Sequence, residues 1–518
     1  MSTDQRQIAR AAMIVMGAFV LSRVLGLARE IIISNYFGTS ADLGAYLAAF
    51  RIPDIIFQVV AGGALASAFI PTFSTLLAHD DEVGGWKLVS AIVNWLLIVL
   101  TSLALLGILF APQLVKYVVA PGFDAGQQRL TAELMRYMLV STVIFGLSGV
   151  VMGILNSYQH FLLPALAPAI YNLAIIASAL LFAQRFGVRS LAIGVIAGAI
   201  LHLIIQMPKL LGVGLKYTPL YLGPHNSSVR EVGWLMLPRA LGLGVVQINF
   251  LVNTILASHL GANTLTALNY AWLLMLLPQG IFAQGIATAA FPTFSRLIAQ
   301  RKHDDMRSTL SATIRAILYI SIPASVGLVI LRVPLIQLLF QRGAFDFQST
   351  EAVAAALQFY ALGLFAHASV EITTRAFYAM HDTATPVAIG VAAMGANIIL
   401  SLLLVHPMNY PGLALANSLA TIGEMLALIY IVRKRLGGLG GKAMWVSISR
   451  MLVAAACMAA IVWVLRDGLA TYGIIIQLGG SIAVAAFTYV LISAALGSTE
   501  IRTLWGWTKQ RAASSRNR

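Results

Sequence analysis

The chain is a succession of long apolar segments separated by short polar connections. Most segments exceed the roughly 20 residues that an α-helix needs to cross a hydrocarbon core about 30 Å thick. The pattern predicts an all-α polytopic membrane protein with about fourteen transmembrane helices. These cover residues 11–37, 44–78, 86–111, 130–156, 162–184, 189–213, 229–260, 265–298, 307–332, 350–380, 384–406, 411–433, 442–466 and 472–496.

A short motif occurs twice, as AFIPTFS at residues 68–74 and as AAFPTFS at residues 289–295. The copies end the second and the eighth predicted helices, and small residues precede each copy. The two copies are six helices apart, an even offset, so both halves have the same orientation in the membrane. Parallel repeats of this kind are typical of two-lobed transporters. We expect two parallel six-helix lobes followed by two C-terminal helices and a basic tail, at residues 1–222, 223–436, 437–500 and 501–518.

Composition supports a membrane protein and narrows its class. The chain is 59% hydrophobic and 10% charged, with a mean hydropathy of +0.85, which excludes an ordinary soluble domain. The net charge of +15 does not indicate a nucleic-acid partner. Most Lys and Arg residues fall at the N-terminus, in alternate loops and in the C-terminal tail, which predicts that both termini are cytoplasmic. The single cysteine, Cys457, excludes disulfides within the chain.

Charged residues occur inside the first predicted helix, at Arg23, Arg29 and Glu30. Arg23 lies near mid-membrane, where a charge costs at least about 2.5–3.5 kcal/mol and normally faces a cavity or a partner. In one interpretation, Arg23 and Glu30 neutralise each other and Arg29 extends to the surface. In the other, the arginines form a site for an anion and the acid tunes it. We favour the second, because the planar guanidinium suits phosphate.

The second predicted helix adds charges of both signs. Asp42 lies at its start, and Arg51 and Asp54 are three positions apart with Pro53 between them as a predicted kink. Arg51 either assists the anion site or pairs with Asp54, and the sequence leaves both open. The first lobe therefore carries most of the intramembrane charge.

The second half of the chain has mainly amides and hydroxyls within its predicted helices. Oxygens of this kind are able to coordinate sodium, but the set lacks the carboxylate that usually anchors a hard cation, so interhelical hydrogen bonding is the favoured interpretation. The residues concerned are Asn253, Asn397, Ser401 and Asn417. Glu371 and Arg375 are placed to pair at i and i+4, whereas Glu424 has no evident partner in the sequence. No nucleotide-binding or catalytic motif is found, which predicts a transporter that is not an enzyme and has no cofactor.

Several motifs resemble those of the MurJ (MviN) family: SRVLGLARE at 22–30, FRIP at 50–53, APGF at 120–123 and RAFYAMHDTATP at 375–386. This family contains the lipid II flippases of bacterial peptidoglycan synthesis, within the multidrug/oligosaccharidyl-lipid/polysaccharide exporter superfamily. The resemblance covers the whole chain. It implies a protein of the bacterial inner membrane that moves an undecaprenyl-pyrophosphate-linked precursor between leaflets.

The resemblance also implies roles for particular residues. A central cationic cavity would bind the pyrophosphate at Arg23, Arg29 and Arg51, with Glu30 and Asp42 in matching acidic positions. The two C-terminal helices would form an apolar groove for the lipid tail. Membrane lipids and cell-wall synthesis enzymes are the expected partners, and the membrane potential or a monovalent ion is the expected driving force. A sodium site would map onto Asn253, Asn397, Ser401 and Asn417.

The chain departs from the family pattern at several cavity positions. Phe57 or Gln58 stands where the family commonly has arginine, and Gly62 replaces an acid. In the eighth helix Trp272 and Leu273 match an aspartate–arginine pair, and Leu276 matches a later acid. Three alternatives therefore stay open. They are a flippase for another polyprenyl-linked glycan, a drug or cation antiporter of the same superfamily, and a non-transporting scaffold for cell-wall synthesis.

Overall fold

The computed structural model describes residues 3–498 and residue 500, without the side chains of residues 3–14, 63–67, 245 and 262. Every regular element in this part of the chain is helical, which confirms the predicted all-α class. Among the described residues, 13 segments are long and apolar enough to cross a membrane. The long helix α1 (Thr3–Phe37) precedes them and carries the charged motif. The basic tail predicted at 501–518 lies outside the described residues.

Contacts divide the described chain into two compact units. The division falls between Thr266 and Ala267, and the short segment Gly343–Phe345 belongs with the first unit. The predicted lobe boundaries at 222/223 and 436/437 differ from this contact division, because the helix that follows residue 223 makes its contacts within the first unit. The lobes and the tail groove at 437–500 stay predictions about function.

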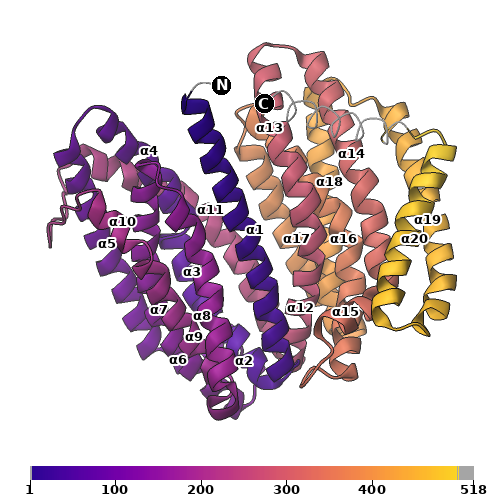
Figure 1. Cartoon of the computed structure of the whole chain (residues 1–518), viewed down its shortest axis with the longest axis horizontal. Helices are drawn as coiled ribbons and strands as arrows, with labels where there is room; N and C mark the ends of the chain where they lie inside the picture. The colour runs from indigo at the N-terminus through magenta and orange to yellow at the C-terminus, as the bar shows by residue number, and fades with distance from the viewer. Residues whose placement is uncertain (1–2, 499, 501–518) are drawn as a thin grey trace. The chain divides into compact units, whose positions relative to one another are not determined.

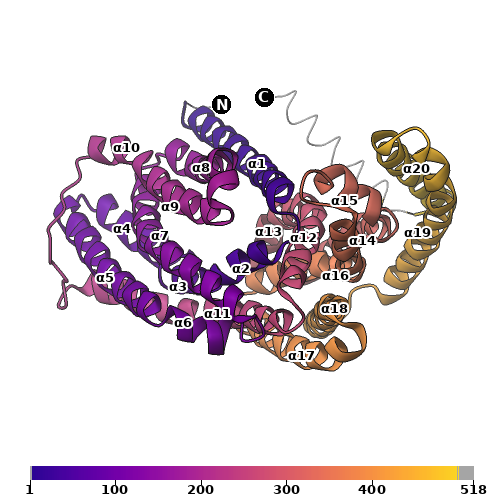
Figure 2. The ribbon, with the colours of Figure 1, turned by 90° about the horizontal axis from the view of Figure 1, so that it is seen from below.

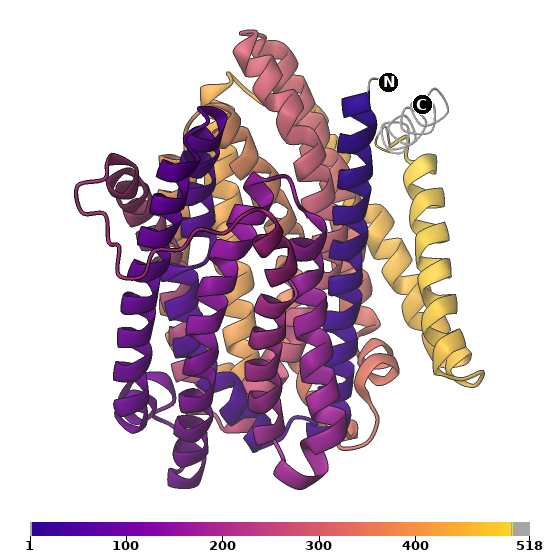
Figure 3. The ribbon, with the colours of Figure 1, turned by 60° about the vertical axis from the view of Figure 1, so that its left-hand side comes forward.

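The first unit begins with α1, which Figure 3 shows as one long indigo helix. Its other elements are α2 (Ala41–Ala49), α3 (Arg51–Val60), α4 (Gly63–Ala78), α5 (Glu82–Leu109), α6 (Ala111–Leu114), the π-helical turn η1 (Val115–Val119), α7 (Ala125–Ser157), α8 (Leu162–Phe186), α9 (Arg189–Ile204), α10 (Met207–Gly212) and α11 (Ser227–Ser258).

The predicted helix 44–78 is broken into α2, α3 and α4, and proline explains the first break. Pro53 has no N–H and cannot bond the carbonyl four residues earlier, at Ala49. Ala49 is the last residue of α2. The second break lies at Ala61 and Gly62, within the run of small residues before the repeated motif. The kink predicted at Pro53 is confirmed, whereas a single continuous helix over 44–78 is wrong.

Helix α7 is the centre of the first unit, and α1, α8, α9, α7 and α5 follow one another as packed neighbours (Figure 2). Close approach of α9 to α8 depends on glycine: a Cβ on Gly194 would lie 2.9 Å from Ile175 Cα. The core beside α7 is aromatic, with the Phe69 and Phe73 rings stacked at 5.3 Å and both side chains fully buried. Helix α11 packs against α3 and α4.

The second unit contains α12 (Ala262–Pro278) from Ala267 onward, the π-helical turn η2 (Gln279–Ala283), α13 (Gln284–Ala299), α14 (His303–Ile330), α15 (Arg332–Phe340), α16 (Phe347–Ala379), α17 (Ala384–Met408), α18 (Tyr410–Arg435), α19 (Gly441–Ala470) and α20 (Ile474–Ala495). The predicted helix 265–298 is thus interrupted by η2, and α15 forms where a connection was expected.

Helix α16 is the centre of the second unit and packs against α13, α14, α15 and α18 (Figure 1). Helix α17 covers α18, and the last two helices form a pair in which α19 packs on α14. The core is continuous across these helices and includes Phe294, Ile314, Phe377 and Met451. The pair formed by α19 and α20, which follows the predicted second lobe, is therefore packed on α14 through α19.

Candidate functional site

Arg29 on α1 is held by two side chains in the first unit. Its Nη1 donates a hydrogen bond of 3.1 Å to Asn172 Oδ1 on α8. Its Nε and Nη2 donate to the same oxygen of Glu30, at 3.2 and 2.5 Å. Only 26% of the Arg29 side chain and 13% of the Glu30 side chain are exposed. Arg29 therefore lies fixed and largely buried.

Asn172 joins α8 to α1 and was not predicted as a site residue. Its Nδ2 donates to the carbonyl of Ser22 at 3.3 Å, so one amide contacts α1 on both sides of Gly26. Asn172 itself is buried. A lone asparagine in an apolar segment is common, and without the fold nothing in the sequence distinguishes this one.

Arg23 differs from Arg29, although the two lie only about 9 Å apart along the helix axis. Its side chain is exposed and its guanidinium lies 5.2 Å from the centre of the Phe19 ring. Among the described residues it takes part in no hydrogen bond or ion pair. The interpretation in which Arg23 neutralises Glu30 while Arg29 extends outward is wrong, because Glu30 pairs with Arg29.

Both charged residues of α3 contact α11. Arg51 Nε donates to Thr254 Oγ1 at 2.9 Å, and the guanidinium lies 5.7 Å from the Phe250 ring centre. Asp54 Oδ2 accepts a hydrogen bond of 2.9 Å from Gln247 Nε2. These contacts explain why α11 packs within the first unit, since polar groups at membrane depth favour interhelical hydrogen bonds.

Asp42 lies in the first turn of α2, where Ser40 caps the helix. Its side chain is exposed and lies within electrostatic range of Arg189 on α9. Arg189 in turn forms two hydrogen bonds with the carboxylate of Glu133 on α7, at 2.7 and 2.9 Å.

The residues predicted to bind sodium are distributed over both units. Asn253 belongs to the first unit, where its Nδ2 donates to the Asn249 carbonyl at 3.0 Å. Asn397 and Ser401 are buried one turn apart on α17, and Asn417 Oδ1 on α18 lies 3.2 Å from His367 Nε2. Within the described residues no group of three or more His, Cys, Asp or Glu could hold a metal ion. The sodium site stays a prediction.

An aromatic and polar cluster surrounds His367 in the second unit. The Trp272 ring lies edge-on to His367 at 5.6 Å and to Tyr360 at 5.3 Å. His367 Nε2 also lies 3.3 Å from Thr421 Oγ1. The family resemblance implies a charged residue at position 272, and this chain has the aromatic Trp272 there.

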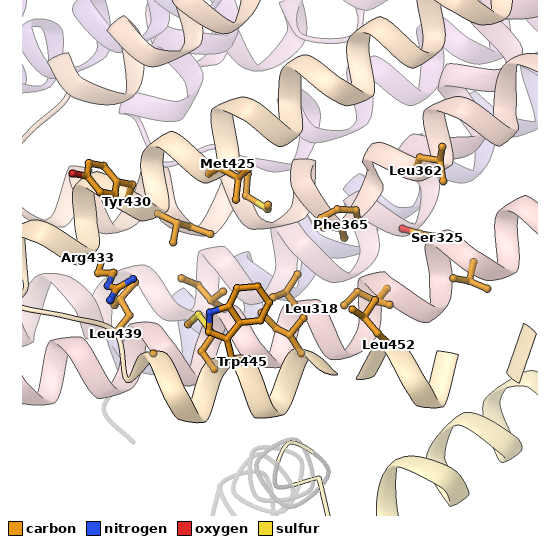
Figure 4. A pocket seen from close by; sticks show the side chains of 18 of the residues that line it. Leu318, Ser325, Leu362, Phe365, Met425, Tyr430, Arg433, Leu439, Trp445 and Leu452 are labelled. Atoms are coloured by element: carbon orange, nitrogen blue, oxygen red, sulfur yellow. The ribbon is translucent and has the colours of Figure 1, made fainter. Parts of the chain in front are cut away.

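A large apolar pocket lies between α14, α16, α18 and α19, with a volume of about 720 Å³. Leucine, isoleucine and phenylalanine side chains line most of it, as Figure 4 shows for Leu318, Phe365 and Leu452. Arg433, Tyr430 and Leu439 lie together at one end (Figure 4). Helix α19 contributes to the lining of this pocket and α20 does not, and the tail groove expected at the two C-terminal helices stays a prediction.

The family described as "Lipid II flippase MurJ" matches residues 33–480. The chain is 31% identical over 438 residues to lipid II flippase MurJ of Burkholderia cenocepacia, covering 82% of this chain and 84% of the relative. It is 29% identical over 518 residues to the probable lipid II flippase MurJ of Vibrio cholerae, covering 96% and 97%.

Solved structures agree with the sequence relatives. The inward closed conformation of a lipid II flippase MurJ superposes with a TM-score of 0.79 at 26% identity, covering 93% of this chain and 98% of that one. An inward-facing multidrug resistance MATE family transporter of the MOP superfamily shares the fold, with a TM-score of 0.68 at 15% identity, covering 83% and 98%. The chain therefore belongs to the MurJ lipid II flippase family.

Proposed function

We propose that this protein is a lipid II flippase of the bacterial inner membrane, moving the lipid-linked precursor from the cytoplasmic to the outer leaflet by alternating access. Family membership supports the reaction and the substrate class. The observation that carries the proposal to this chain is Arg23: a guanidinium within a membrane helix that takes part in no hydrogen bond or ion pair among the described residues.

An unpaired arginine at membrane depth costs free energy unless it faces water or a ligand. A pyrophosphate has the complementary problem, because a bare anion cannot cross hydrocarbon without a large desolvation cost. A site that offers guanidinium donors lets the headgroup exchange water for charge-assisted hydrogen bonds. In this proposal the protein lowers the free-energy barrier to headgroup movement by shielding the headgroup from hydrocarbon. It changes no covalent bond.

The three arginines have different roles in this proposal. Arg23 supplies donors to the pyrophosphate. Arg29 adds positive charge, and its pairing with Glu30 and Asn172 fixes where that charge lies. Arg51 assists from α3, since its Nε bond to Thr254 Oγ1 fixes the guanidinium on α11. Glu30 limits the net charge so that the anion is released, and Asp42 contributes an acid in the first turn of α2.

The lipid tail is proposed to use the apolar pocket beside α19. The tail leaves one apolar environment, the bilayer, for another, so a pocket of about 720 Å³ would bind part of a polyprenyl chain by van der Waals packing and not by removal from water. Arg433 at one end places a positive charge near the mouth. The rest of the tail would stay in the bilayer.

Orientation, driving force and partners complete the proposal. The last turn of α18 carries Arg433, Lys434 and Arg435, which supports a cytoplasmic end for that helix and therefore cytoplasmic termini. The substrate carries charge, so the membrane potential couples to transport at about 2.3 kcal/mol per elementary charge and 100 mV. Cell-wall synthesis enzymes that supply or consume the precursor are the proposed protein partners.

The test is complementation of a bacterium depleted of its own lipid II flippase. We expect Arg23→Ala and Arg29→Ala to abolish growth while the protein still accumulates in the membrane. Arg185→Ala is the matched control, because Arg185 is exposed at the end of α8 and should be replaceable.

Other outcomes separate the alternatives. Full growth with both alanine variants would contradict the arginine site and favour a scaffold, which does not need these side chains. Growth that fails with the unaltered chain, together with transport of another polyprenyl-linked glycan in vesicles, would assign a different substrate. Export of cationic drugs that requires carboxylates and tolerates loss of the arginines would indicate an antiporter.

A further inference from the structure

Glu424 on α18 is a carboxylate within a membrane-spanning helix, and it pairs with no arginine among the described residues. It lies about 21 Å along the helix axis from Tyr410 and about 17 Å from Arg435, the two ends of α18. Its side chain is half-buried and takes part in no hydrogen bond or ion pair among the described residues. Glu30, Glu133 and Glu371 are also in long helices, and each pairs with an arginine. Glu424 therefore differs from these three glutamates, because no arginine among the described residues neutralises its charge.

The carboxylate lies against α17 at Gly390. A Cβ on Gly390 would be 3.6 Å from Glu424 Oε1, an ordinary contact distance. The only titratable side chain on α17 is His406, about 24 Å from Gly390 along the axis. The side of Glu424 that faces α17 is therefore without charge or acid–base groups.

Titratable groups on the other neighbours are engaged elsewhere or distant. On α16, His367 contacts Asn417 and Thr421, while Glu371 pairs with Arg375 and Glu351 is exposed. On α18 itself, Arg433 is the first cation beyond Glu424, about 14 Å further along the axis; Tyr430 is exposed, and Tyr410 lies at the far end of the helix. No cation among the described residues compensates the carboxylate.

An isolated ionised carboxylate at this depth is costly, and binding a cation removes the cost. A hard metal ion requires several oxygen ligands. Here the nearest hydroxyl along the helix, Thr421 Oγ1, donates to the Asn417 carbonyl at 2.9 Å, and the described residues contain no acidic or histidine cluster able to hold a metal. A proton needs one oxygen only.

We propose that Glu424 is a proton-binding site and that the proton exchanged there couples the transport cycle of this protein. The coupling half rests on the proposed flippase function. In one conformation the carboxylate takes a proton from water and becomes a neutral acid that packs against α17 at Gly390. In the other conformation water reaches the group and the proton leaves. Sodium at Asn397, Ser401 and Asn417 is the competing assignment.

The first experiment detects the proton directly, without transport. Dicyclohexylcarbodiimide is an apolar reagent that adds to protonated carboxyl groups in membranes, and mass spectrometry of the purified full-length protein locates the adduct. We expect an adduct on Glu424 whose rate of formation falls by about tenfold per pH unit once the group ionises, and no adduct on Glu371, its ion-paired control. Glu424→Gln should remove the adduct.

Absence of an adduct on Glu424 between pH 5.5 and pH 9, or a rate independent of pH, would overturn the proton site. Protection of Glu424 by sodium would overturn it in favour of the metal. Because the readout is chemical, it decides the question even if the chain flips no lipid II.

The second experiment tests coupling in proteoliposomes with a pH-sensitive dye inside. We expect lipid II movement by the unaltered protein to respond to an imposed pH gradient and movement by Glu424→Gln not to respond. Glu351→Gln is the control, because that residue is exposed at the start of α16. An unchanged gradient response in Glu424→Gln would reject coupling through this residue. Failure of both proteins to move lipid II would instead reject the proposed function.

Discussion

Arg29 Nη1 and Asn172 Oδ1 lie 3.1 Å apart, although the two residues are separated by 143 positions in the sequence. The same asparagine donates to the Ser22 carbonyl, so it fixes α1 to α8 on both sides of Gly26. The relationship explains why two arginines of one helix behave differently. Arg29 is positioned by protein atoms, whereas Arg23 takes part in no hydrogen bond or ion pair among the described residues, and the proposed function assigns its donors to the pyrophosphate.

Asn172→Ala should weaken both the fold and the function. Loss of the amide leaves a half-buried guanidinium hydrogen unpaired, which costs about 1–3 kcal/mol. We expect a lower temperature of thermal unfolding in detergent and partial complementation. Asn156→Ala on α7 is the control, since the Asn156 side chain has no hydrogen bond among the described residues. Equal unfolding temperatures for the two variants would contradict the inference that the hydrogen bonds of Asn172 stabilise the packing of α1 on α8.

Arg23→Lys should keep the charge but lose the planar fork. An ammonium binds phosphate as a point charge, whereas a guanidinium offers two parallel donors. We expect Arg23→Lys to complement better than Arg23→Ala and worse than the unaltered protein, with lipid II binding weakened by roughly tenfold, or about 1.4 kcal/mol. Native mass spectrometry of the complex measures the affinity. Binding equal to that of the unaltered chain would show that Arg23 acts through charge alone.

Gly38→Ala and Gly343→Ala should each destabilise the first unit. Both glycines have positive φ, +53° and +57°, and Ala344 N donates to Asn35 O at 2.8 Å between them. An added Cβ would lie 2.3 Å from a backbone oxygen in either case. Strain of this kind costs at least about 1–3 kcal/mol.

Thermal unfolding in detergent measures the glycine effect. Gly233→Ala in α11 is the control, because a Cβ there meets no atom within 4 Å and alanine favours a helix. We expect Gly233→Ala to unfold at the same or a higher temperature. Loss of stability in all three variants alike would contradict a specific close approach at Gly38 and Gly343.

Leu452→Trp should obstruct the apolar pocket without disturbing the headgroup site. Leu452 lines the pocket from α19 and is itself half-exposed, so the larger ring enters the free volume. Displacing about two methylene groups of a bound tail removes their van der Waals contacts with the pocket lining and so weakens binding of the tail.

Binding of two lipid-linked substrates tests the pocket. We expect the long-tailed substrate to bind Leu452→Trp more weakly and a short-tailed analogue to bind it as before. Leu402→Trp on α17 is the control, because Leu402 is equally exposed and lies outside the pocket lining. An equal loss for both analogues would mean that the tail does not use this pocket.

Acid should destabilise the connection between α16 and α17 through Asp382. Hydrogen bonds from the Thr385 hydroxyl and N–H, together with Arg435, lower the pKa of Asp382 to about 2 from the usual 3.8. A lowered pKa means that the ionised form stabilises the fold above about pH 4 and that this stabilisation is lost as the pH falls toward 2.

The contribution of Asp382 is isolated by comparing the unfolding temperatures of two proteins at each pH. The difference in unfolding temperature between the unaltered protein and Asp382→Asn should be constant above about pH 4.5 and shrink as the pH falls toward 2. Asp80→Asn, whose carboxylate has no hydrogen bond among the described residues, should show no such change. A difference that grew with acid would contradict the sign of the argument.

The sequence alone determined most of the helices and which of them carry charged groups. Hydrocarbon offers no hydrogen-bond partners, so each spanning segment must satisfy its own backbone and must be long and apolar. That requirement is local, and it made most of the long helices from α5 to α20 recognisable within a few residues, whereas the short α15 formed where a connection was expected. The same logic identified Arg23, Arg29 and Glu424 as unusual, and the Pro53 kink followed from the missing N–H.

Only the tertiary structure decided which group each charge meets. The sequence left Arg23 and Arg29 as alternative partners of Glu30, and the structure pairs it with Arg29. Arg51 and Asp54 contact Thr254 and Gln247, about two hundred positions away. Such partners depend on which helices pack together and at what rotation, and hydropathy alone determines neither, because the lipid-facing and protein-facing sides of most membrane helices are both largely apolar.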